Sequence, residues 1–293
     1  MEKRPLFGPA GNSRSFYEAK LKSTWQAPAW LEQLGLDAYE YSAGNGIKGS
    51  AETFARIGEE AKKHHIALSL HAPYYISLSS VDPEKRLKSV ETICRSIEAA
   101  EAMGADRIVI HTGSASKITR EQAVDYAKDT MFKALESLGN TGVRLGLETM
   151  GKINQLGTLD EVLEICKMDA RLCPVIDFGH LNARNVGGLF TCADDYRRVF
   201  TRIDEVLGSA YLDGLHCHFS KIEYTSAGEK RHLTFEDTVF GPPFEPLMQV
   251  LAEDRLNPRV IVESDGTMAE DALTLKRTYE AYLGQSVEQE RNG

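Results

Sequence analysis

With 293 residues, of which 42% are hydrophobic and 26% charged, the chain suits one large globular domain without an apolar run long enough to cross a bilayer. The formal charge of −9 argues against non-specific nucleic-acid binding by the whole surface, although a local basic face remains compatible with it. Five scattered cysteines without a CxxC pair argue against a disulfide framework, and an N-terminus unlike a signal peptide predicts a cytoplasmic protein.

Short apolar segments alternate with longer amphipathic segments from one end of the chain to the other. Eight of the short segments are predicted to be strands: Pro5–Gly8, Ala38–Ser42, Ala67–His71, Arg107–His111, Arg144–Glu148, Cys173–Asp177, Gly214–His218 and Arg259–Glu263. Helices are predicted between them at Ala51–His65, Glu84–Met103, Arg120–Leu138 and from Leu159 onward, where Thr158 and Glu161 form a capping box.

This alternation predicts a parallel sheet that is covered by helices. Eight repeats of the unit favour closure into a barrel over an open doubly wound sheet, and no GxGxxG follows the first strand. We therefore predict an α/β protein with one domain, a (β/α)8 TIM barrel over residues 1–283, followed by a polar C-terminal tail at residues 284–293.

Six consecutive predicted strands, the third to the eighth, end in histidine or an acidic residue. The residues are His71, His111, Glu148, Asp177 followed by His180, His216 with His218, and Glu263. In a barrel of this type the carboxyl ends of the strands carry the active site. Carboxylates gathered at one barrel mouth repel one another at a cost of several kcal/mol unless cations neutralise them. The pattern predicts a divalent metal site, and imidazole mixed with carboxylate favours zinc over magnesium.

Residues in a strand alternate between its two faces, so His216 and His218 should point to the same side of the seventh strand. If this side is the barrel interior, Cys217 points outward and is a buried thiol beneath a helix.

The motifs resemble those of endonuclease IV, the apurinic/apyrimidinic-site endonuclease family within the xylose isomerase-like barrels. They run in the family's order from residue 71 to 264 and read HAPYYISL, IHTGS, LET, IDFGH, HCHFSK, EKRH and VES. The resemblance implies two or three zinc ions, with manganese as the alternative metal. It assigns His71, His111 and Glu148 to the first ion, Glu148 as a bridge with Asp177, His216 and Glu263 to the second, and His180 and His232 to the third.

The sequence departs from the family pattern at several positions. Lys230 stands where the family's third site has an aspartate, and a charged lysine cannot be a ligand. His218 stands where the family usually has asparagine, which makes it a weaker candidate ligand, and Thr149 replaces the asparagine after the bridging glutamate. These departures place the chain in an outlying branch of the family.

The resemblance implies incision of duplex DNA at abasic sites by a monomeric enzyme, a step of DNA base-excision repair. Glu148 would join the two ions that activate water, and Lys230 or Arg231 would stabilise the leaving oxygen in place of a third ion. Tyr74 and Tyr75 align with DNA-contacting residues of the family. Basic residues in loops predicted on the catalytic face would position phosphates, and the candidates are Lys152, Arg184 and Lys221. The two tyrosines would probe the base stack, or alternatively pack over the barrel rim.

Two other functions remain open. A metal-dependent sugar isomerase or epimerase on the same barrel would also use Glu148, Asp177, His216 and Glu263 around one ion, with a small sugar as substrate. The additional histidines that distinguish a nuclease are His71, His111, His180 and His232. A non-catalytic binding protein with a structural metal is disfavoured, because structural zinc sites are usually closed shells of four ligands.

Overall fold

The structure is a computed structural model that describes residues 3–292, with side chains described up to residue 285. Eight parallel strands form one sheet in the order β1-β10-β7-β6-β5-β4-β3-β2. Their bounds are β1 (Leu6–Pro9), β2 (Ala38–Ser42), β3 (Ala67–His71), β4 (Arg107–His111), β5 (Arg144–Glu148), β6 (Leu172–Asp177), β7 (His216–Phe219) and β10 (Arg259–Val262). The predicted (β/α)8 barrel is confirmed.

The first and second strands close the barrel. The Asp37 amide donates to the Phe7 carbonyl, and the Gly11 amide donates to the Glu40 carbonyl, each over 2.9 Å. Gly8 permits this approach, since a Cβ atom built on it would lie 1.8 Å from the Ala38 carbonyl oxygen. A side chain at this position would therefore push β1 away from β2.

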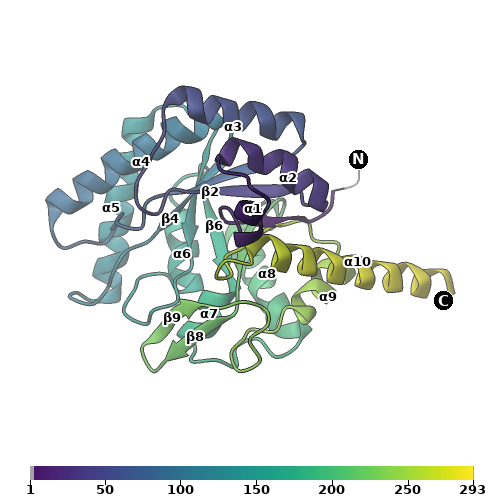
Figure 1. The fold of residues 1–293 in the computed structure, drawn as a ribbon. Helices are drawn as coiled ribbons and strands as arrows, with labels where there is room; N and C mark the ends of the chain where they lie inside the picture. The colour runs from purple at the N-terminus through teal and green to yellow at the C-terminus, as the bar shows by residue number, and fades with distance from the viewer. Residues whose placement is uncertain (1–2, 293) are drawn as a thin grey trace.

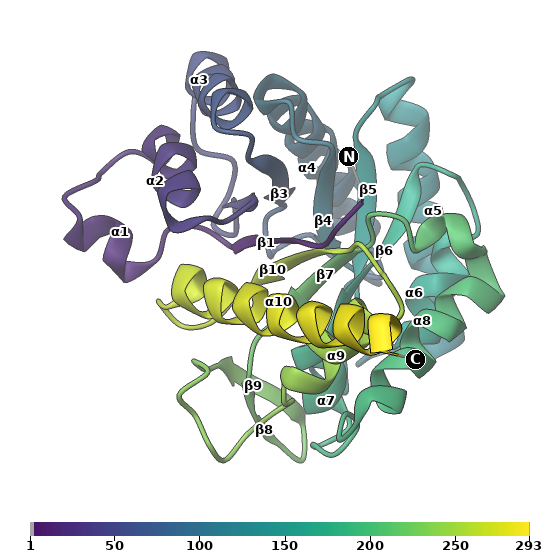
Figure 2. The same cartoon turned by 90° about the vertical axis from the view of Figure 1, so that its right-hand side faces the viewer.

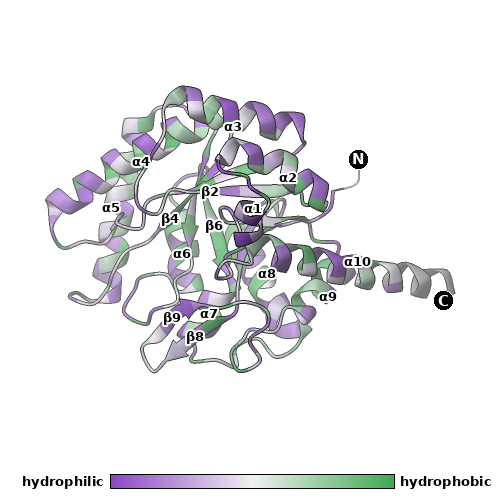
Figure 3. Ribbon diagram, in the orientation of Figure 1, coloured by the Kyte–Doolittle hydropathy of each residue, from purple (hydrophilic) through white to green (hydrophobic). Residues whose placement is uncertain are grey.

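Helices surround the strands on the outside (Figures 1 and 2). Their bounds are α1 (Arg14–Glu18), α2 (Ala27–Leu34), α3 (Ala51–Lys63), α4 (Pro83–Met103), α5 (Arg120–Leu138), α6 (Leu159–Cys166), α7 (Phe178–Arg184), α8 (Ala193–Leu207), α9 (Glu245–Glu253) and α10 (Met268–Asn292). The predicted capping box is present, because Thr158 accepts from the Glu161 amide and Glu161 accepts from the Thr158 amide. Figure 3 shows hydrophobic residues along β4 and β6 and hydrophilic patches on α4 and α5.

Two features differ from the sequence-based expectation. An antiparallel hairpin, β8 (Ile222–Thr225) and β9 (Gly228–His232), follows β7, although the charged β9 sequence GEKRH has no strand-like hydrophobic alternation. Helix α10 continues to Asn292 through the segment expected to be a polar tail, while residue 293 lies outside the described residues. Among residues 3–292, no helix combines the length and the apolar character that a membrane span requires.

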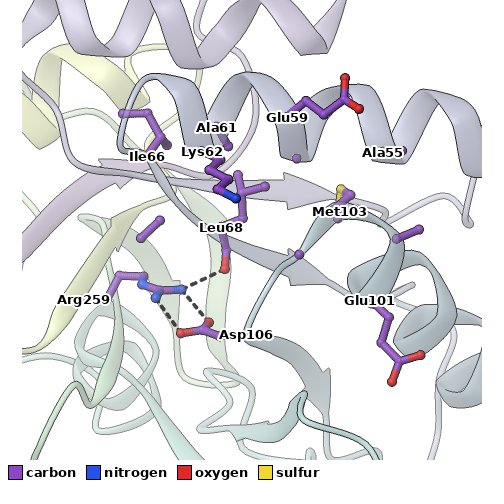
Figure 4. A pocket seen from close by; sticks show the side chains of 14 residues that line it. Ala55, Glu59, Ala61, Lys62, Ile66, Leu68, Glu101, Met103, Asp106 and Arg259 are labelled. Carbon is purple, nitrogen blue, oxygen red and sulfur yellow. Dashed lines mark hydrogen bonds and ion pairs between the residues drawn. The ribbon is translucent and has the colours of Figure 1, made fainter.

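Three charged residues join strands at the amino-terminal end of the barrel. Arg259 donates to both carboxylate oxygens of Asp106, at 2.9 and 2.8 Å, and to the Leu68 carbonyl (Figure 4). Arg107 also donates to both oxygens of Asp106. Asp106 and Arg259 line a cleft of 580 Å³ between α3 and α4. The single charge of Asp106 thereby offsets part of the positive charge of two guanidinium groups that the barrel largely buries.

Asp106→Asn should destabilise the protein at neutral pH. Partial burial raises the pKa of this carboxyl, but Arg259 and Arg107 outweigh it and hold the pKa well below its usual range. A lowered pKa stabilises the fold above the ordinary carboxyl pKa of about 3.9, and this contribution disappears as the pH falls through the folded-state pKa. Because Asp106 is half-exposed, we expect a loss of about 1–2 kcal/mol at pH 7.

Urea denaturation of both proteins from pH 7 to pH 2.5 measures this contribution. The difference in unfolding free energy should shrink steadily below about pH 4. A difference that stays constant with pH would contradict the assignment of the effect to the ionised carboxylate.

Candidate metal centre

The first group of candidate ligands lies at the carboxyl ends of three adjacent strands. Glu148, at the end of β5, is fully buried, and its Oε2 lies 3.4 Å from His71 Nε2 and 3.1 Å from His111 Nε2. The register pairs His111 with Glu148 directly, because β4 and β5 are neighbours. His71 Nδ1 donates to the Ala72 carbonyl over 2.8 Å. That hydrogen bond directs Nε2 toward Glu148, the orientation that a metal ligand requires.

The second group shares Glu148 with the first. Its Oε1 lies 3.0 Å from Nδ1 of His218, and the same nitrogen lies 3.4 Å from Glu263 Oε2. Asp177 completes this group of four, whose ligand atoms all lie within 4.8 Å of one another. One carboxylate oxygen of Glu148 therefore faces each group, which is the arrangement that a bridging ligand needs.

The third group consists of His180, Glu229 and His232. His180 lies in the first turn of α7, where its amide donates to Asp177 Oδ1 over 2.7 Å. Its Nδ1 donates to the Thr149 carbonyl over 3.0 Å, and its Nε2 lies 3.5 Å from Glu229 Oε2. Glu229 and His232 come from β9, so the unpredicted hairpin supplies two of the three members.

The unpaired polar atoms of the centre fit a cation. Glu148 Oε2 and Asp177 Oδ2 are buried and have no hydrogen-bond partner among the described residues. Nearby imidazole rings compensate these oxygens only in part, and a divalent ion would remove the remaining cost of burying them. A set of imidazole nitrogens and carboxylate oxygens suits zinc or manganese.

The pKa values show how strongly these groups interact. Burial raises the pKa of Asp177 to about 6, and the carboxylates of Glu263 and Glu148 add to the rise. Burial alone would lower the pKa of His71, but its contact with Glu148 outweighs burial and raises the pKa to about 9. Opposite charges are therefore concentrated within one small buried volume.

Sequence reasoning placed His216 in the second group, but the structure places it one layer deeper in the barrel. His216 Nε2 lies 2.9 Å from Glu40 Oε2, and both side chains are fully buried. His218, two residues further along β7, stands with Glu148, Asp177 and Glu263 instead. Both histidines face the interior, as the strand alternation predicts, and Cys217 between them is buried.

Glu40 and Glu229 are candidate functional residues that sequence reasoning missed. Glu40 lies between Tyr39 and Tyr41 in a mostly buried strand, and an acidic residue in that setting is a signal that could have been followed. Glu229 directly precedes Lys230 in the charged β9 segment, where the sequence contains no signal that separates a ligand from a surface charge.

Comparisons with known proteins identify the family of this chain. A family model described as xylose isomerase-like TIM barrel matches residues 28–279. The chain belongs to the xylose isomerase-like TIM barrel family. Within this family, it is 29% identical over 276 residues to an uncharacterized protein of Methanocaldococcus jannaschii, which covers 94% of this chain and 96% of that protein. A probable endonuclease 4 of Mycoplasma pneumoniae is 30% identical over 211 residues, 69% of this chain and 70% of that protein.

Solved structures of the xylose isomerase-like barrels share the fold. Endonuclease IV from Thermus thermophilus has a TM-score of 0.68 and 20% identity, with 96% of this chain and 100% of that chain covered. A D-tagatose 3-epimerase-like protein has a TM-score of 0.67 and 20% identity, with 97% and 99% covered. The resemblance to endonuclease IV is confirmed, and the fold itself is common to nucleases and sugar epimerases.

A pocket of 450 Å³ opens above the candidate ligands of this xylose isomerase-like barrel. Beyond the ligands it is lined by Tyr74, Met150, Lys152 and Gln155. The Tyr74 ring stacks on His111 with 5.4 Å between centroids, although more than half of the side chain remains exposed. Tyr75 is exposed and does not line the pocket. Of the five residues expected to contact DNA, Tyr74 and Lys152 thus border the pocket.

Three basic residues that we expected near the substrate form their contacts elsewhere. Lys230 and Arg231 contact the two carboxylate oxygens of Glu223 across the hairpin, at 2.5 and 2.6 Å, and neither lines the pocket. Lys221 donates to the carbonyls of Phe235 and Asp237 and so ties down the following loop. The structure therefore does not bring these residues to the site where a leaving oxygen or a phosphate would lie.

Arg184, also expected to contact DNA, holds the loop between β5 and α6. Its guanidinium donates to four carbonyls of that loop, at distances from 2.8 to 3.1 Å. Arg120 donates to two of the same carbonyls. This loop presents Met150, Lys152 and Gln155 to the pocket, so Arg184 acts on the site through the backbone.

Arg184→Met should loosen this loop without unfolding the barrel. Four carbonyl oxygens lose a charged donor, and we expect a loss of about 1–3 kcal/mol in unfolding free energy. Hydrogen exchange at residues 150–156 should become faster than in the unmodified protein. Arg198→Met is the matched control, because Arg198 is an exposed arginine paired with Asp195. Unchanged exchange in this loop would contradict the role given to Arg184.

Proposed function

We propose that this protein is a metal-dependent phosphodiester hydrolase that incises duplex DNA at abasic sites. The number of ligand groups carries the proposal. A single-ion sugar isomerase needs only the group of Glu148, Asp177, His218 and Glu263. Two further groups adjoin it here, one built from His71 and His111 and the other from His180, Glu229 and His232. Several ions around one pocket suit a phosphodiester, whose attacking and leaving oxygens both need charge stabilisation.

The proposed ligands follow the three groups, with zinc as the favoured metal and manganese as the alternative. His71, His111 and Glu148 would hold one ion, Glu148, Asp177, His218 and Glu263 a second, and His180, Glu229 and His232 a third. When bound, such ions act as Lewis acids that activate water and neutralise phosphodiester oxygens. The probable endonuclease 4 relatives support the same interpretation, since their name describes this class of enzyme.

The side chains of this chain would position the substrate around the ions. Glu148 would fix the spacing of two ions, because its two oxygens face different ligand groups. Lys152 lines the pocket, and its ammonium group would attract a phosphate. The pocket of 450 Å³ would receive one deoxyribose phosphate that lacks its base, whereas a stacked base pair would have to be opened first. Tyr74 and the exposed Tyr75 would lie against the neighbouring bases.

The decisive experiment compares two duplexes with the purified, zinc-loaded protein. One contains a single abasic-site analogue, and the other is identical except for a normal nucleotide. We expect one nick on the 5′ side of the analogue, none in the control duplex, and loss of nicking after chelation. An intact abasic duplex together with epimerisation of ketoses would overturn the proposal in favour of the sugar enzyme.

A further inference from the structure

Below the candidate metal centre lies a second layer of buried polar residues that the proposed reaction does not use. It consists of Glu40 on β2, Ser69 on β3 and His216 on β7, none of them exposed. The register of β2 and β3 pairs Glu40 directly with Ser69, whose hydroxyl donates to Glu40 Oε2 over 2.8 Å. His216 Nε2 lies 2.9 Å from the same oxygen. One carboxylate oxygen is therefore fully engaged within this layer.

The other oxygen of Glu40 points upward to the metal centre. Glu40 Oε1 lies 3.0 Å from Nε2 of His218, the ring nitrogen opposite the one that faces Glu148 and Glu263. Neither of these two buried atoms makes a hydrogen bond to any described residue, so the 3.0 Å approach between them is an ion-pair contact, and it is the polar contact that each has. Glu40 thus spans the interior from β2 to a histidine of β7.

Three of the other histidines of the centre show what such an outer contact does. His71 and His180 each use Nδ1 to donate to a backbone carbonyl, and His232 Nδ1 lies 2.8 Å from the Ser220 hydroxyl. In each ring the opposite nitrogen is left for the centre. A metal-binding histidine needs this arrangement, because the nitrogen that does not bind the ion carries a proton and needs an acceptor.

We propose that Glu40 is a positioning residue of the metal centre, which holds the His218 ring with Nδ1 turned toward Glu148 and Glu263, where an ion would bind. The inference rests on the metal centre of the proposed function. Glu40 differs from the other outer partners described above because it is a carboxylate, and an ionised acceptor makes the stronger contact to a ring N–H. Ser69 and His216 in turn fix the carboxylate, so the two layers act as one unit.

Cobalt binding tests this role without relying on activity. Co²⁺ is titrated into metal-depleted protein, and the visible absorption spectrum reports the ligand set and the affinity. Glu40→Gln should weaken binding at the His218 group by about 10–100-fold and alter its spectrum. Glu59→Gln, at an exposed position of α3, is the matched control and should bind cobalt like the unmodified protein.

A second variant covers the case in which Glu40→Gln does not fold. Ser69→Ala keeps the carboxylate but removes one of its hydrogen bonds, and it should weaken cobalt binding in the same direction by a smaller factor. Circular dichroism of the metal-depleted variants checks that the barrel is retained.

Three results would overturn the inference. Folded Glu40→Gln or Ser69→Ala with unchanged affinity and spectrum would remove Glu40 from its positioning role while leaving the metal centre intact. Loss of one whole ion in both Glu40→Gln and His216→Gln, with the remaining spectrum unchanged, would make Glu40 a ligand of a separate ion. Failure of the unmodified protein to bind any cobalt would overturn the metal centre itself.

Discussion

Glu148→Gln should retain the barrel and lose essentially all turnover. Glu148 is the acidic residue whose two oxygens face two ligand groups, so the amide of glutamine would weaken the binding of both ions at once. Ions of this kind contribute several kcal/mol of transition-state stabilisation, and a loss of about 4 kcal/mol corresponds to roughly a thousandfold lower rate. Nicking of the abasic duplex measures the rate, and metal analysis of the same preparation measures the bound ions.

A matched control separates this effect from a general change of charge. Glu164→Gln removes an acid from the surface of α6, where Glu164 pairs with Lys128 and Lys167 and does not approach the centre. Its rate and metal content should equal those of the unmodified protein. A Glu148→Gln variant with near-normal nicking would remove Glu148 from the bridging role.

Glu229→Gln should cost the protein one metal ion per chain. Glu229 is the acidic member of the third group, 3.5 Å from His180, whereas Lys230 pairs with Glu223. Loss of an outer partner lowers metal affinity by roughly 10–100-fold, and loss of a direct ligand should lower the affinity for this ion by more than that. Elemental analysis after dialysis measures the ion count, and the nicking rate should fall with it.

Lys230→Gln is the matched control for this prediction, because it changes the next residue of the same strand. It should leave the ion count unchanged, since Lys230 does not line the pocket. A normal ion count in Glu229→Gln would mean that the third group binds no metal. A lower count in Lys230→Gln would mean that the hairpin, rather than the Glu229 carboxylate, is responsible.

The proposed ligand groups would distinguish the two classes of enzyme that share this fold. The group of Glu148, Asp177, His218 and Glu263 lies on neighbouring strands and is compatible with either chemistry. On the proposed function, the distinction would come from β3, β4, α7 and the β8–β9 hairpin, which supply the additional histidines and Glu229. Substrate class would then be decided at the edge of the barrel mouth rather than within its core.

The sequence by itself determined the barrel, because the signals involved are local. A short apolar strand, a capping box such as that of Thr158 and Glu161, and an amphipathic helix each depend on residues within one element. The positions of His71, His111, Glu148 and Asp177 followed as well, since every strand of a parallel barrel places its last residue at the same mouth.

Only the tertiary structure decided which residues meet. Whether His216 or His218 reaches the centre depends on how far β7 is shifted along its neighbours, and alternation alone allows both. Glu40 and His216 are separated by 176 positions in the sequence, and no local sequence pattern predicts a contact between them. Arg184 is bound by backbone carbonyls, which every residue type carries, so its sequence position could not distinguish a loop clamp from a phosphate contact.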